Sequence, residues 1–464
     1  MTTRMRLICL SGVLATIPLA AYGQHTWHVD VDACPDEGTG TRADPLCSIQ
    51  SAINRSSAGD TVSVAPGIYT ENIDYLGKSI AIISTNGSGE TTIRNAADHR
   101  VVRFSNSEGR GAVLDGFTIT GASGGIGCGP NSEPTIRRCR MEFNFAATGP
   151  GIDCFEANPL IVNCEFFNNE ATLYNGGAIL CNRSSPVIAN CLIKGNGAMI
   201  GGGGIYCYDN ASPTIVNCNL YLNGAKWGGG VFADNNSHPT LANCIVWLNY
   251  PGALVVGVDS SITATYSSIQ STPVYPGIGN IAESPHFHTS GDFRLVPGSP
   301  GIDAGDNSAV PVEALLDLDG LPRLADDTFT DDTGAGTAPI VDMGVYEYRD
   351  CDEDGDPDPL KFGDCSVSPK WCDCNQNGLL DECDIDDGRA NDCNLNDVPD
   401  VCEGPGDFDA DGDVDLINFA FFRSCQTPPI ASQLFGSCCF FDFDVDLDVD
   451  LRNFAQFQNG FDPS

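Results

Sequence analysis

The sequence predicts a parallel β-helix, an all-β solenoid in which short strands stack coil upon coil, followed by a small acidic tail. Three observations support this prediction: a repeat of 25–27 residues, short apolar runs between turn residues, and a change of composition after residue 350. A repeat of this length cannot bury a hydrophobic face alone, so it has to stack on its neighbours. Each coil would then add one strand spacing, about 4.8 Å, to the solenoid.

Two columns of cysteines carry the repeat. One column has gaps of 25, 27, 27 and 26 residues and comprises Cys139, Cys164, Cys191, Cys218 and Cys244. The other has gaps of 26, 27 and 26 residues and comprises Cys128, Cys154, Cys181 and Cys207. We interpret these columns as inward packing or structural disulfides rather than as catalytic thiols.

Other residues recur with the same period and indicate turns. We expect a hydrogen-bonded ladder at a bend from the asparagines that precede four of the cysteines, namely Asn163, Asn190, Asn217 and Asn243. Glycines precede the other cysteine column, and we expect them in a turn that needs a positive φ; they lie at 124–125, 176–177, 201–204 and 228–230. Runs of three to five apolar residues between such turns favour strands over helices.

The N-terminal part predicts the start of the same solenoid. Ile49, Ala52 and Ile53 have the spacing of a short amphipathic helix, which would cover the first coil. The stretch CSIQSAINRSSAGDTVSVAPGIYTENI resembles the opening of right-handed parallel β-helix proteins of the pectate-lyase-like superfamily. The SPTIVNC…GGGIYC coils resemble polymorphic-outer-membrane-protein-type repeats. This resemblance covers residues 44–250 and implies a fold, but no particular activity.

Residues 260–349 are less regular. GDFRLVPGSPGIDAGD and VDMGVYEY resemble the closing segment of β-helices in secreted bacterial proteins, which implies last coils and a C-terminal cap. We favour solvated turn positions over an ion site for the aspartates of this segment, which are Asp303, Asp306, Asp317, Asp319 and Asp342.

The start of the chain predicts export. Residues 1–23 combine Arg4 and Arg6 with an apolar stretch at 7–20 and small residues before Gln24, as in a signal peptide. The apolar stretch is too short for a membrane span, so we expect a secreted or cell-surface protein without a transmembrane segment. The 22 cysteines fit such an oxidising compartment. The β-helix with its N-terminal cap would then occupy residues 24–259.

Charge is concentrated in the tail. The net charge is −39, and residues 351–464 hold 27 of the 62 acidic residues but 5 of the 23 basic ones. Such a chain repels phosphate backbones, so nucleic acid is not expected as a partner. A dense acidic tail either stays solvated or binds divalent cations.

The last part of the tail, residues 405–464, contains an acidic loop twice, at an offset of 35 residues. Calcium takes six to eight oxygen ligands from such loops, and the predicted ligands are Asp407, Asp409, Asp411, Asp413, Asp415 and Asn418, then Asp442, Asp444, Asp446, Asp448, Asp450 and Asn453. The pair resembles a dockerin domain, which implies Ca²⁺ and a cohesin-like or cell-surface partner. It departs from that pattern where asparagine replaces an acidic twelfth residue, and where Leu447 replaces the loop glycine.

Residues 350–404 contain a second duplication, at an offset of 19 residues. DCNQNGLLDEC and DCNLNDVPDVC resemble thrombospondin type 3 calcium repeats. That resemblance implies calcium ligands among Asp373, Asn375, Asn377, Asp381, Asp392, Asn394, Asn396 and Asp400. The alternative is an acidic linker stapled by disulfides. Zinc is not expected, because the clusters lack histidine.

Candidate catalytic residues are few. The coils carry scattered charged residues: Glu142, Asp153, Glu156, Glu165, Arg183, Lys194, Asp209, Lys226 and Asp234. Glu156, Arg183 and Asp209 have similar positions in successive coils and would share a column. Two carboxylates with an arginine suit a lyase or hydrolase, but we favour an ordinary solvated edge.

Three functions remain open. We favour an extracellular scaffold or binding protein, associated with polysaccharide and attached through its calcium-binding tail. The alternatives are a polysaccharide lyase or glycoside hydrolase that carries a dockerin-like module, and a surface adhesin.

Overall fold

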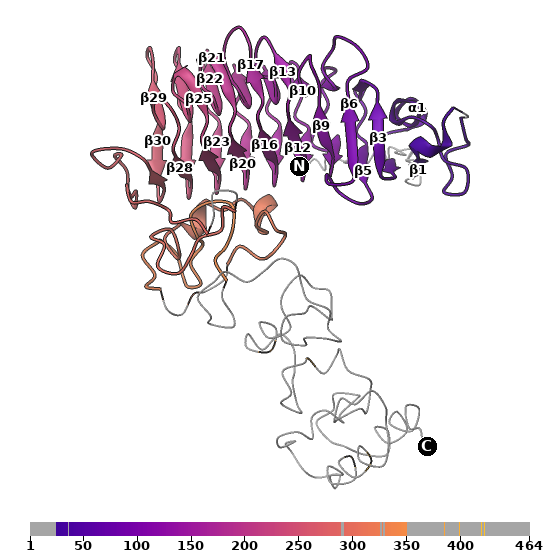
Figure 1. Cartoon of the computed structure of the whole chain (residues 1–464). Helices are drawn as coiled ribbons and strands as arrows, with labels where there is room; N and C mark the ends of the chain where they lie inside the picture. The colour runs from indigo at the N-terminus through magenta and orange to yellow at the C-terminus, as the bar shows by residue number, and fades with distance from the viewer. Residues whose placement is uncertain are drawn as a thin grey trace, which may run out of the picture.

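The computed structural model describes residues 25–349, apart from 36, 289–291, 325, 326, 328 and 329, together with four isolated positions, 385, 399, 419 and 422. Its strands stack coil upon coil into a parallel β-helix (Figure 1). Every neighbouring pair of named strands is parallel, as the repeat predicts, and the register is regular except for a shift between β21 and β25. The predicted signal peptide and the predicted calcium loops lie outside the described residues.

All but the terminal coils contribute a strand to each of three long sheets, and four coils contribute to a fourth, short sheet. The first sheet contains β1 (Thr26–Val29), β2 (Thr61–Val64), β5 (Ala81–Ser84), β8 (Val113–Asp115), β11 (Thr135–Arg137), β15 (Leu160–Val162), β19 (Val187–Ala189), β23 (Thr214–Val216), β27 (Thr240–Ala242) and β30 (Thr263–Thr265). The second sheet contains β4 (Ile73–Asp74), β7 (Val102–Phe104), β10 (Ile126–Cys128), β14 (Ile152–Phe155), β18 (Ile179–Asn182), β22 (Ile205–Tyr208), β26 (Val231–Asp234) and β29 (Leu254–Val256).

The third sheet contains β3 (Gly67–Thr70), β6 (Thr91–Arg94), β9 (Thr118–Thr120), β12 (Arg140–Glu142), β16 (Glu165–Phe167), β20 (Leu192–Lys194), β24 (Asn219–Tyr221), β28 (Ile245–Trp247) and β31 (Ser268–Ile269). The fourth sheet contains β13 (Phe145–Ala146), β17 (Glu170–Ala171), β21 (Gly197–Gly201) and β25 (Gly224–Trp227). The helical turns are α1 (Ile49–Arg55), η1 (Val31–Ala33), η2 (Asn307–Ala309) and η3 (Val312–Ala314).

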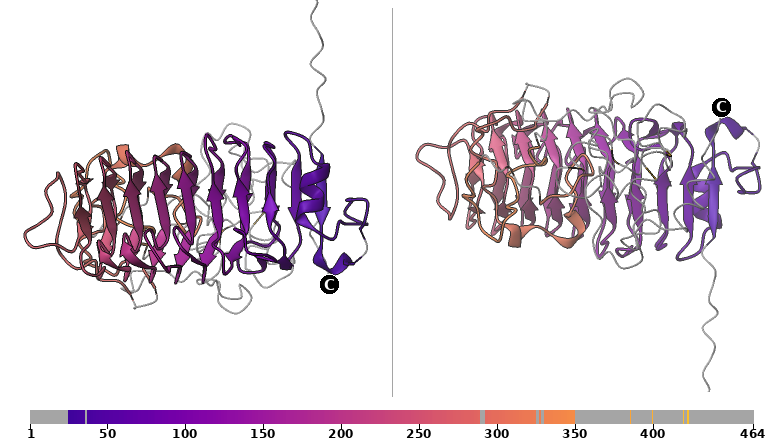
Figure 2. Two further views of the ribbon diagram at one scale, coloured as in Figure 1. Left: turned by 90° about the horizontal axis from the view of Figure 1, so that it is seen from above. Right: turned by 90° about the horizontal axis from the view of Figure 1, so that it is seen from below.

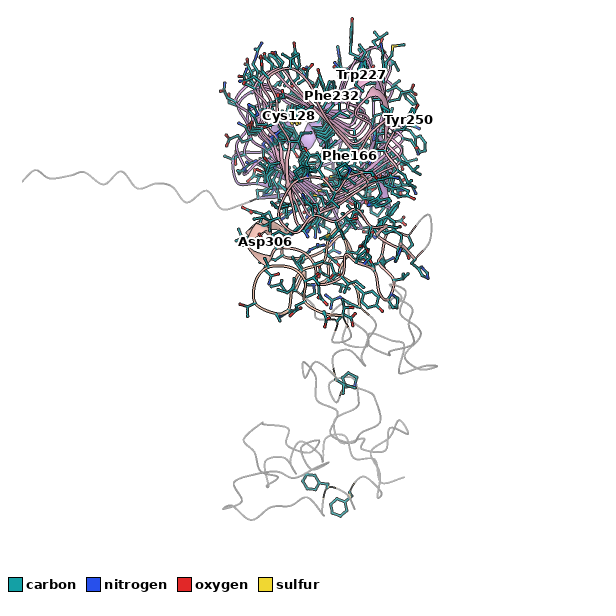
Figure 3. All side chains as sticks on the ribbon, turned by 90° about the vertical axis from the view of Figure 1, so that its left-hand side faces the viewer. Cys128, Phe166, Trp227, Phe232, Tyr250 and Asp306 are labelled. Atoms are coloured by element: carbon teal, nitrogen blue, oxygen red, sulfur yellow. A yellow bond between two sulfur atoms is a disulfide. The ribbon has the colours of Figure 1, made fainter. Side chains whose placement is uncertain are left out.

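The core fills the inside of the coils. Successive side chains of a strand point to opposite faces, so alternate residues such as Val62 and Val64 of β2 are buried. Figure 3 looks along the solenoid and shows Cys128 and Phe166 in the interior, with Trp227 and Tyr250 at the periphery.

The cysteine columns belong to this core. In the second sheet, Cys128, Cys154 and Cys181 lie opposite one another in neighbouring strands. All nine cysteines of the coils are buried free thiols, so of our two interpretations the structure supports inward packing. A disulfide joins Cys34 to Cys47 before the first complete coil.

The first coil is covered by α1, as predicted. Ile49, Ala52 and Ile53 are buried beneath the helix, and the Ser48 hydroxyl caps its N-terminus by accepting a hydrogen bond from Ser51 N (3.1 Å). Figure 2 shows α1 at one end of the stack. The longest helix among the described residues is α1, and its seven residues are too few to cross a bilayer.

The four asparagines of the predicted ladder lie between the first and third sheets, and two of the ladder's three steps are hydrogen-bonded. Asn190 Nδ2 donates to Asn163 Oδ1 (3.3 Å), and Asn243 Nδ2 donates to Asn217 Oδ1 (3.4 Å). All four asparagines have φ of 49–54°, a left-handed conformation that asparagine tolerates better than most residues. The predicted glycine turn is also confirmed, since Gly124, Gly176, Gly202 and Gly228 have positive φ.

The structure contains a second asparagine ladder, which the sequence analysis missed. It lies inside the solenoid after the third sheet and comprises Asn144, Asn169, Asn196, Asn223 and Asn249. The first four side-chain amides donate to the Oδ1 of the next asparagine at 2.8–3.0 Å, and all five donate to a backbone carbonyl of the preceding coil. The ladder thus supplies partners for amides that are almost fully buried.

Residues 301–324 and 330–349, here called the flanking segment, lie along one side of the solenoid, where we expected an end cap. The predicted ladder, called the outer ladder below, binds this segment on its outward side. Asn163 Nδ2 donates to Asp317 O (2.6 Å), and Asn243 Nδ2 donates to Asp306 O (3.0 Å). Ala314 packs on the outer face of β15 and β19. Figure 1 shows the segment in orange beneath the coils.

The expectation of solvated aspartates in this segment is wrong for three of the five. Asp303, Asp317 and Asp342 are almost fully buried, and so are Arg323 and Glu347. Arg323 Nη2 lies 3.1 Å from Glu347 Oε1, and the Asp342 carboxylate accepts hydrogen bonds from the backbone N–H groups of Asp303 and Tyr348. These aspartates therefore fix the fold of the segment.

We predict that Asn196→Ala lowers the free energy of unfolding by about 3 kcal/mol, because it removes four hydrogen bonds and leaves buried partners unsatisfied. Urea unfolding followed by circular dichroism measures the change. Asn54→Ala, an exposed position in α1, is the matched control and should change stability by less than about 0.5 kcal/mol. Equal effects of the two substitutions would contradict the role of the internal ladder.

We also predict that the flanking segment detaches more readily as the pH rises. Burial raises the pKa of Asp342 to about 7, although Arg323 and two N–H donors oppose the shift. Because the folded pKa lies above the ordinary value of 3.8, the stabilisation is complete below about pH 4 and is lost as the pH rises through 7.

Hydrogen exchange of the segment, corrected for the intrinsic pH effect, should be about 100-fold less protected at pH 8 than at pH 5. Asp342→Asn should flatten this dependence. Protection that is equal at the two pH values in the wild type would refute the prediction.

Candidate functional site

The outer face of the second sheet is hollowed at β10. Arg103 of β7, Gly127 of β10 and Asp153 of β14 lie side by side in the strand register. Since Gly127 has no side chain, the side chain of Arg100 lies over it, between these two charged residues. The hollow, here called the glycine cleft, has a volume of about 250 Å³ and is lined by His99, Arg100, Arg103, Ser105, Gly127, Cys128, Gly129, Asp153 and Phe155.

The arrangement depends on glycine for reasons of space. A Cβ atom on Gly127 would lie 2.7 Å from Arg100 Cδ, and one on Gly129 would lie 3.3 Å from Ser105 Cα. Neither glycine has a positive φ, so backbone strain does not explain them. Gly127 therefore makes room for the Arg100 side chain, and Gly129 makes room for the backbone at Ser105.

Arg100 and Asp153 form the rigid wall of the cleft. Arg100 Nη2 lies 2.7 Å from Asp153 Oδ2, and the same guanidinium donates to Gly149 O (2.7 Å) and Thr148 O (2.9 Å). It thereby ties the loop after β13 to the second sheet. Burial raises the pKa of the Asp153 carboxyl, and the charge of Arg100 partly offsets that rise.

Arg103 has a different environment. Among the described residues, its exposed guanidinium makes no ion pair or side-chain hydrogen bond. Its in-register neighbour Asp74 uses Oδ1 to accept a hydrogen bond from Leu76 N (2.8 Å). With Arg100 and Arg103 against Asp153, the lining carries a surplus of positive charge within a strongly acidic chain. This arrangement attracts an anion.

An aromatic side chain forms the remaining wall. The Phe155 ring is 38% exposed and lines the cleft beside Asp153. Small-molecule sites typically combine such an apolar surface with a few polar groups that fix orientation. The cleft thus offers a free guanidinium, an imidazole, a hydroxyl, a carboxylate and an apolar ring to one ligand.

The predicted column of Glu156, Arg183 and Asp209 lies next to this cleft but does not line it. The structure brings the three together, with Arg183 Nη1 2.8 Å from Glu156 Oε1 and Arg183 Nε 2.6 Å from Asp209 Oδ2. Hydrogen bonds to Glu156 and then to Asp209 raise the pKa of the Arg183 guanidinium. All three residues are in turns with φ of 50–55°, and Arg183 is half exposed. This geometry is that of a solvated edge.

The predicted calcium ligands at 373–400 and 407–453 lie outside the described residues. Within the part of the chain that the structure describes, no group of three or more His, Cys, Asp or Glu side chains is placed to hold a metal ion.

Sequence reasoning singled out Asp153 only as one of several charged residues and missed Arg100 and Arg103. The signal that could have found the cleft is the segment IGCG at 126–129. The corresponding coils read IDCF, ILCN and IYCY, with a side chain at each outward position.

Comparisons with known proteins agree with this fold. Residues 81–269 match the family model described as "Right handed beta helix region". The coils of this chain therefore form a right-handed parallel β-helix. No curated protein sequence matches the chain.

Three solved structures resemble this chain at a low level of similarity. Pectate lyase Pel9A is 14% identical with a TM-score of 0.34, over 70% of this chain and 96% of that one. Pectin methylesterase from carrot is 13% identical with a TM-score of 0.30, over 53% of this chain and 84% of that one. The deglycosylated pectin methylesterase from Aspergillus niger is 11% identical with a TM-score of 0.27, over 53% and 86%. At these levels of similarity, the three proteins say nothing about the activity of this chain.

We predict that Arg100→Ala lowers the free energy of unfolding by about 1–3 kcal/mol, because it leaves Asp153 and two loop carbonyls without their donor. Chemical denaturation measures the change. Arg183→Ala, which removes an exposed arginine with two carboxylate partners, is the matched control and should leave the melting temperature nearly unchanged. A larger effect of Arg183→Ala would show that the exposed column, and not the cleft wall, stabilises this face.

Proposed function

We propose that this protein is an extracellular binding protein whose glycine cleft holds an acidic saccharide, a sugar that bears a carboxylate. The observation that supports this proposal most is the unpaired guanidinium of Arg103 in a positively charged hollow walled by Phe155. Arginine can bind a carboxylate through two parallel hydrogen bonds, which gives both affinity and orientation. The chain's overall charge of −39 disfavours anions over most of the surface, so the positively charged lining of the cleft stands out as an anion site.

The remaining lining groups fit the rest of a sugar ring. Ser105 and the carboxylate of Asp153 offer hydrogen-bond partners for ring hydroxyl groups. The exposed Phe155 ring offers an apolar surface for the C–H face of the sugar. A neutral sugar would leave the Arg103 charge unpaired, so the proposal favours uronates over neutral saccharides.

Chemistry favours binding over turnover. Hydrolysis of a glycosidic bond generally needs two carboxyl groups on either side of the bond. The described lining contains a single carboxyl group, Asp153, and Arg100 engages it at 2.7 Å. Glu156 lies nearby, but its carboxylate is paired with Arg183. The polysaccharide lyase or hydrolase therefore remains the alternative function.

Attachment belongs to the same proposal. We propose that residues 1–23 direct secretion and that the duplicated acidic loops at 350–464 bind Ca²⁺, so that the tail attaches the β-helix to a cohesin-like or cell-surface protein. The support is the spacing of the acidic residues, which matches the oxygen ligands of calcium loops.

We predict that Arg103→Ala weakens the binding of trigalacturonate about 10- to 100-fold, the loss expected for a charge-assisted hydrogen bond. Isothermal titration calorimetry measures the affinity, and added salt should weaken it further. Lys226→Ala, which removes one positive charge from β25, is the control and should bind like the wild type. Equal binding of trigalacturonate and a neutral trisaccharide would count against the proposal.

The enzymatic alternative has its own test. Uronate polymers incubated with the protein should yield neither unsaturated products nor new reducing ends. Turnover that disappears in Glu156→Ala or Arg183→Ala would establish the lyase or hydrolase instead.

For the tail, we predict that EGTA lowers the thermal stability of the full-length protein's C-terminal transition and that Ca²⁺ restores it, because bound metal stabilises the folded form. Differential scanning calorimetry measures the transition. Asp407→Asn combined with Asp409→Asn should reduce the response, and a transition that ignores both EGTA and Ca²⁺ would exclude calcium binding.

A further inference from the structure

A second hollow lies on a different sheet, over the first strands of the solenoid. Its volume is about 560 Å³, and this N-terminal cleft is lined by His28, Val29, Asp30, Arg42, Pro45, Ser63, Ala65, Thr85 and Asn86. It lies on the first sheet, whereas the glycine cleft lies on the second. The two clefts therefore open on different sides of the coils.

Small residues create this hollow. In the register of β1 and β2, Val29 lies beside Val64, and both side chains are buried. The residues that precede and follow each of these valines therefore face outward. Ser63 and Ala65 occupy the outward positions of the middle coil. Because their side chains are short, the floor between β1 and the coil of Thr85 stays open.

A loop forms the far wall of the N-terminal cleft and carries Arg42, the positively charged residue of the lining. Residues 38–46 pair with the free edge of β1, since His28 N donates to Gly40 O (2.9 Å) and Leu46 N donates to His28 O (2.8 Å). The Cys34–Cys47 disulfide closes this loop. Arg42 lies in the turn between Thr41 and Asp44 and lines the cleft from there.

The two clefts share several polar groups, although the N-terminal cleft has one arginine where the glycine cleft has two. Each has an exposed arginine, Arg42 or Arg103, that makes no ion pair or hydrogen bond through its side chain with the described residues. The carboxylate of Asp30 caps η1 by accepting from Asp32 N (3.0 Å) through Oδ1, and Asp44 accepts from Thr39 N (2.9 Å). A histidine and a hydroxyl complete each set.

We propose that the N-terminal cleft is a second site for an acidic saccharide, so that one molecule binds two uronate chains at once and cross-links them. This inference rests on the ligand class proposed for the glycine cleft. Arg42 would pair with the carboxylate, while Asp30, Ser63 and Thr85 offer partners for hydroxyl groups. Two sites on one rigid body raise the avidity for a polymer without any new contact.

Calorimetric titration of the full-length protein with digalacturonate tests the proposal. The wild type and Lys226→Ala should bind two molecules, Arg42→Ala and Arg103→Ala one each, and the double variant none. Ala65→Leu, which fills the N-terminal cleft from an outward position, should also bind one. With polygalacturonate, the wild type should form turbid networks, and each single variant should lose them.

The outcomes separate the two proposals. One site that Arg103→Ala abolishes and Arg42→Ala leaves intact would overturn the N-terminal site and retain the glycine cleft. One site with the opposite response would support the N-terminal site and overturn the glycine cleft. No binding of digalacturonate by the wild type would overturn both.

Discussion

The in-register hydrogen bonding between successive coils is the constraint on which the rest of the structure depends. Because each residue lies directly beside its counterpart in the next coil, every position of the repeat becomes a column along the solenoid. A buried polar residue then has its own counterparts as its nearest partners. The two asparagine ladders satisfy this condition in different ways. The side chains of the internal ladder bond to one another inside the solenoid, whereas those of the outer ladder also donate to backbone carbonyls of the flanking segment.

The sequence predicted the columns well, because a fixed period is visible without knowledge of contacts. The cysteine columns, the outer ladder, the glycine turns and α1 all occur where the period placed them. The internal ladder was missed because Asn144 and its counterparts, unlike those of the outer ladder, do not precede a cysteine. Such a position looks like a solvated turn until the direction of the strand is known.

The flanking segment shows a different limit of prediction from the sequence. Its aspartates resemble solvated turn residues in the sequence, but Asp317 and Asp342 are buried with Arg323 and Glu347 against the solenoid. A segment without a repeat has no period to reveal its partners. Its position depends on long-range contacts, such as that of Asn163 with Asp317, which no local pattern encodes.

The glycine cleft follows from the same constraint as the ladders. A column of outward side chains is interrupted at Gly127, and the Arg100 side chain lies over this position, between Arg103 and Asp153. The most direct test is a crystal structure of the protein soaked with trigalacturonate. The account predicts a uronate carboxylate at Arg103 and the sugar ring beside Phe155. An empty glycine cleft in crystals whose other surfaces hold the ligand would contradict it.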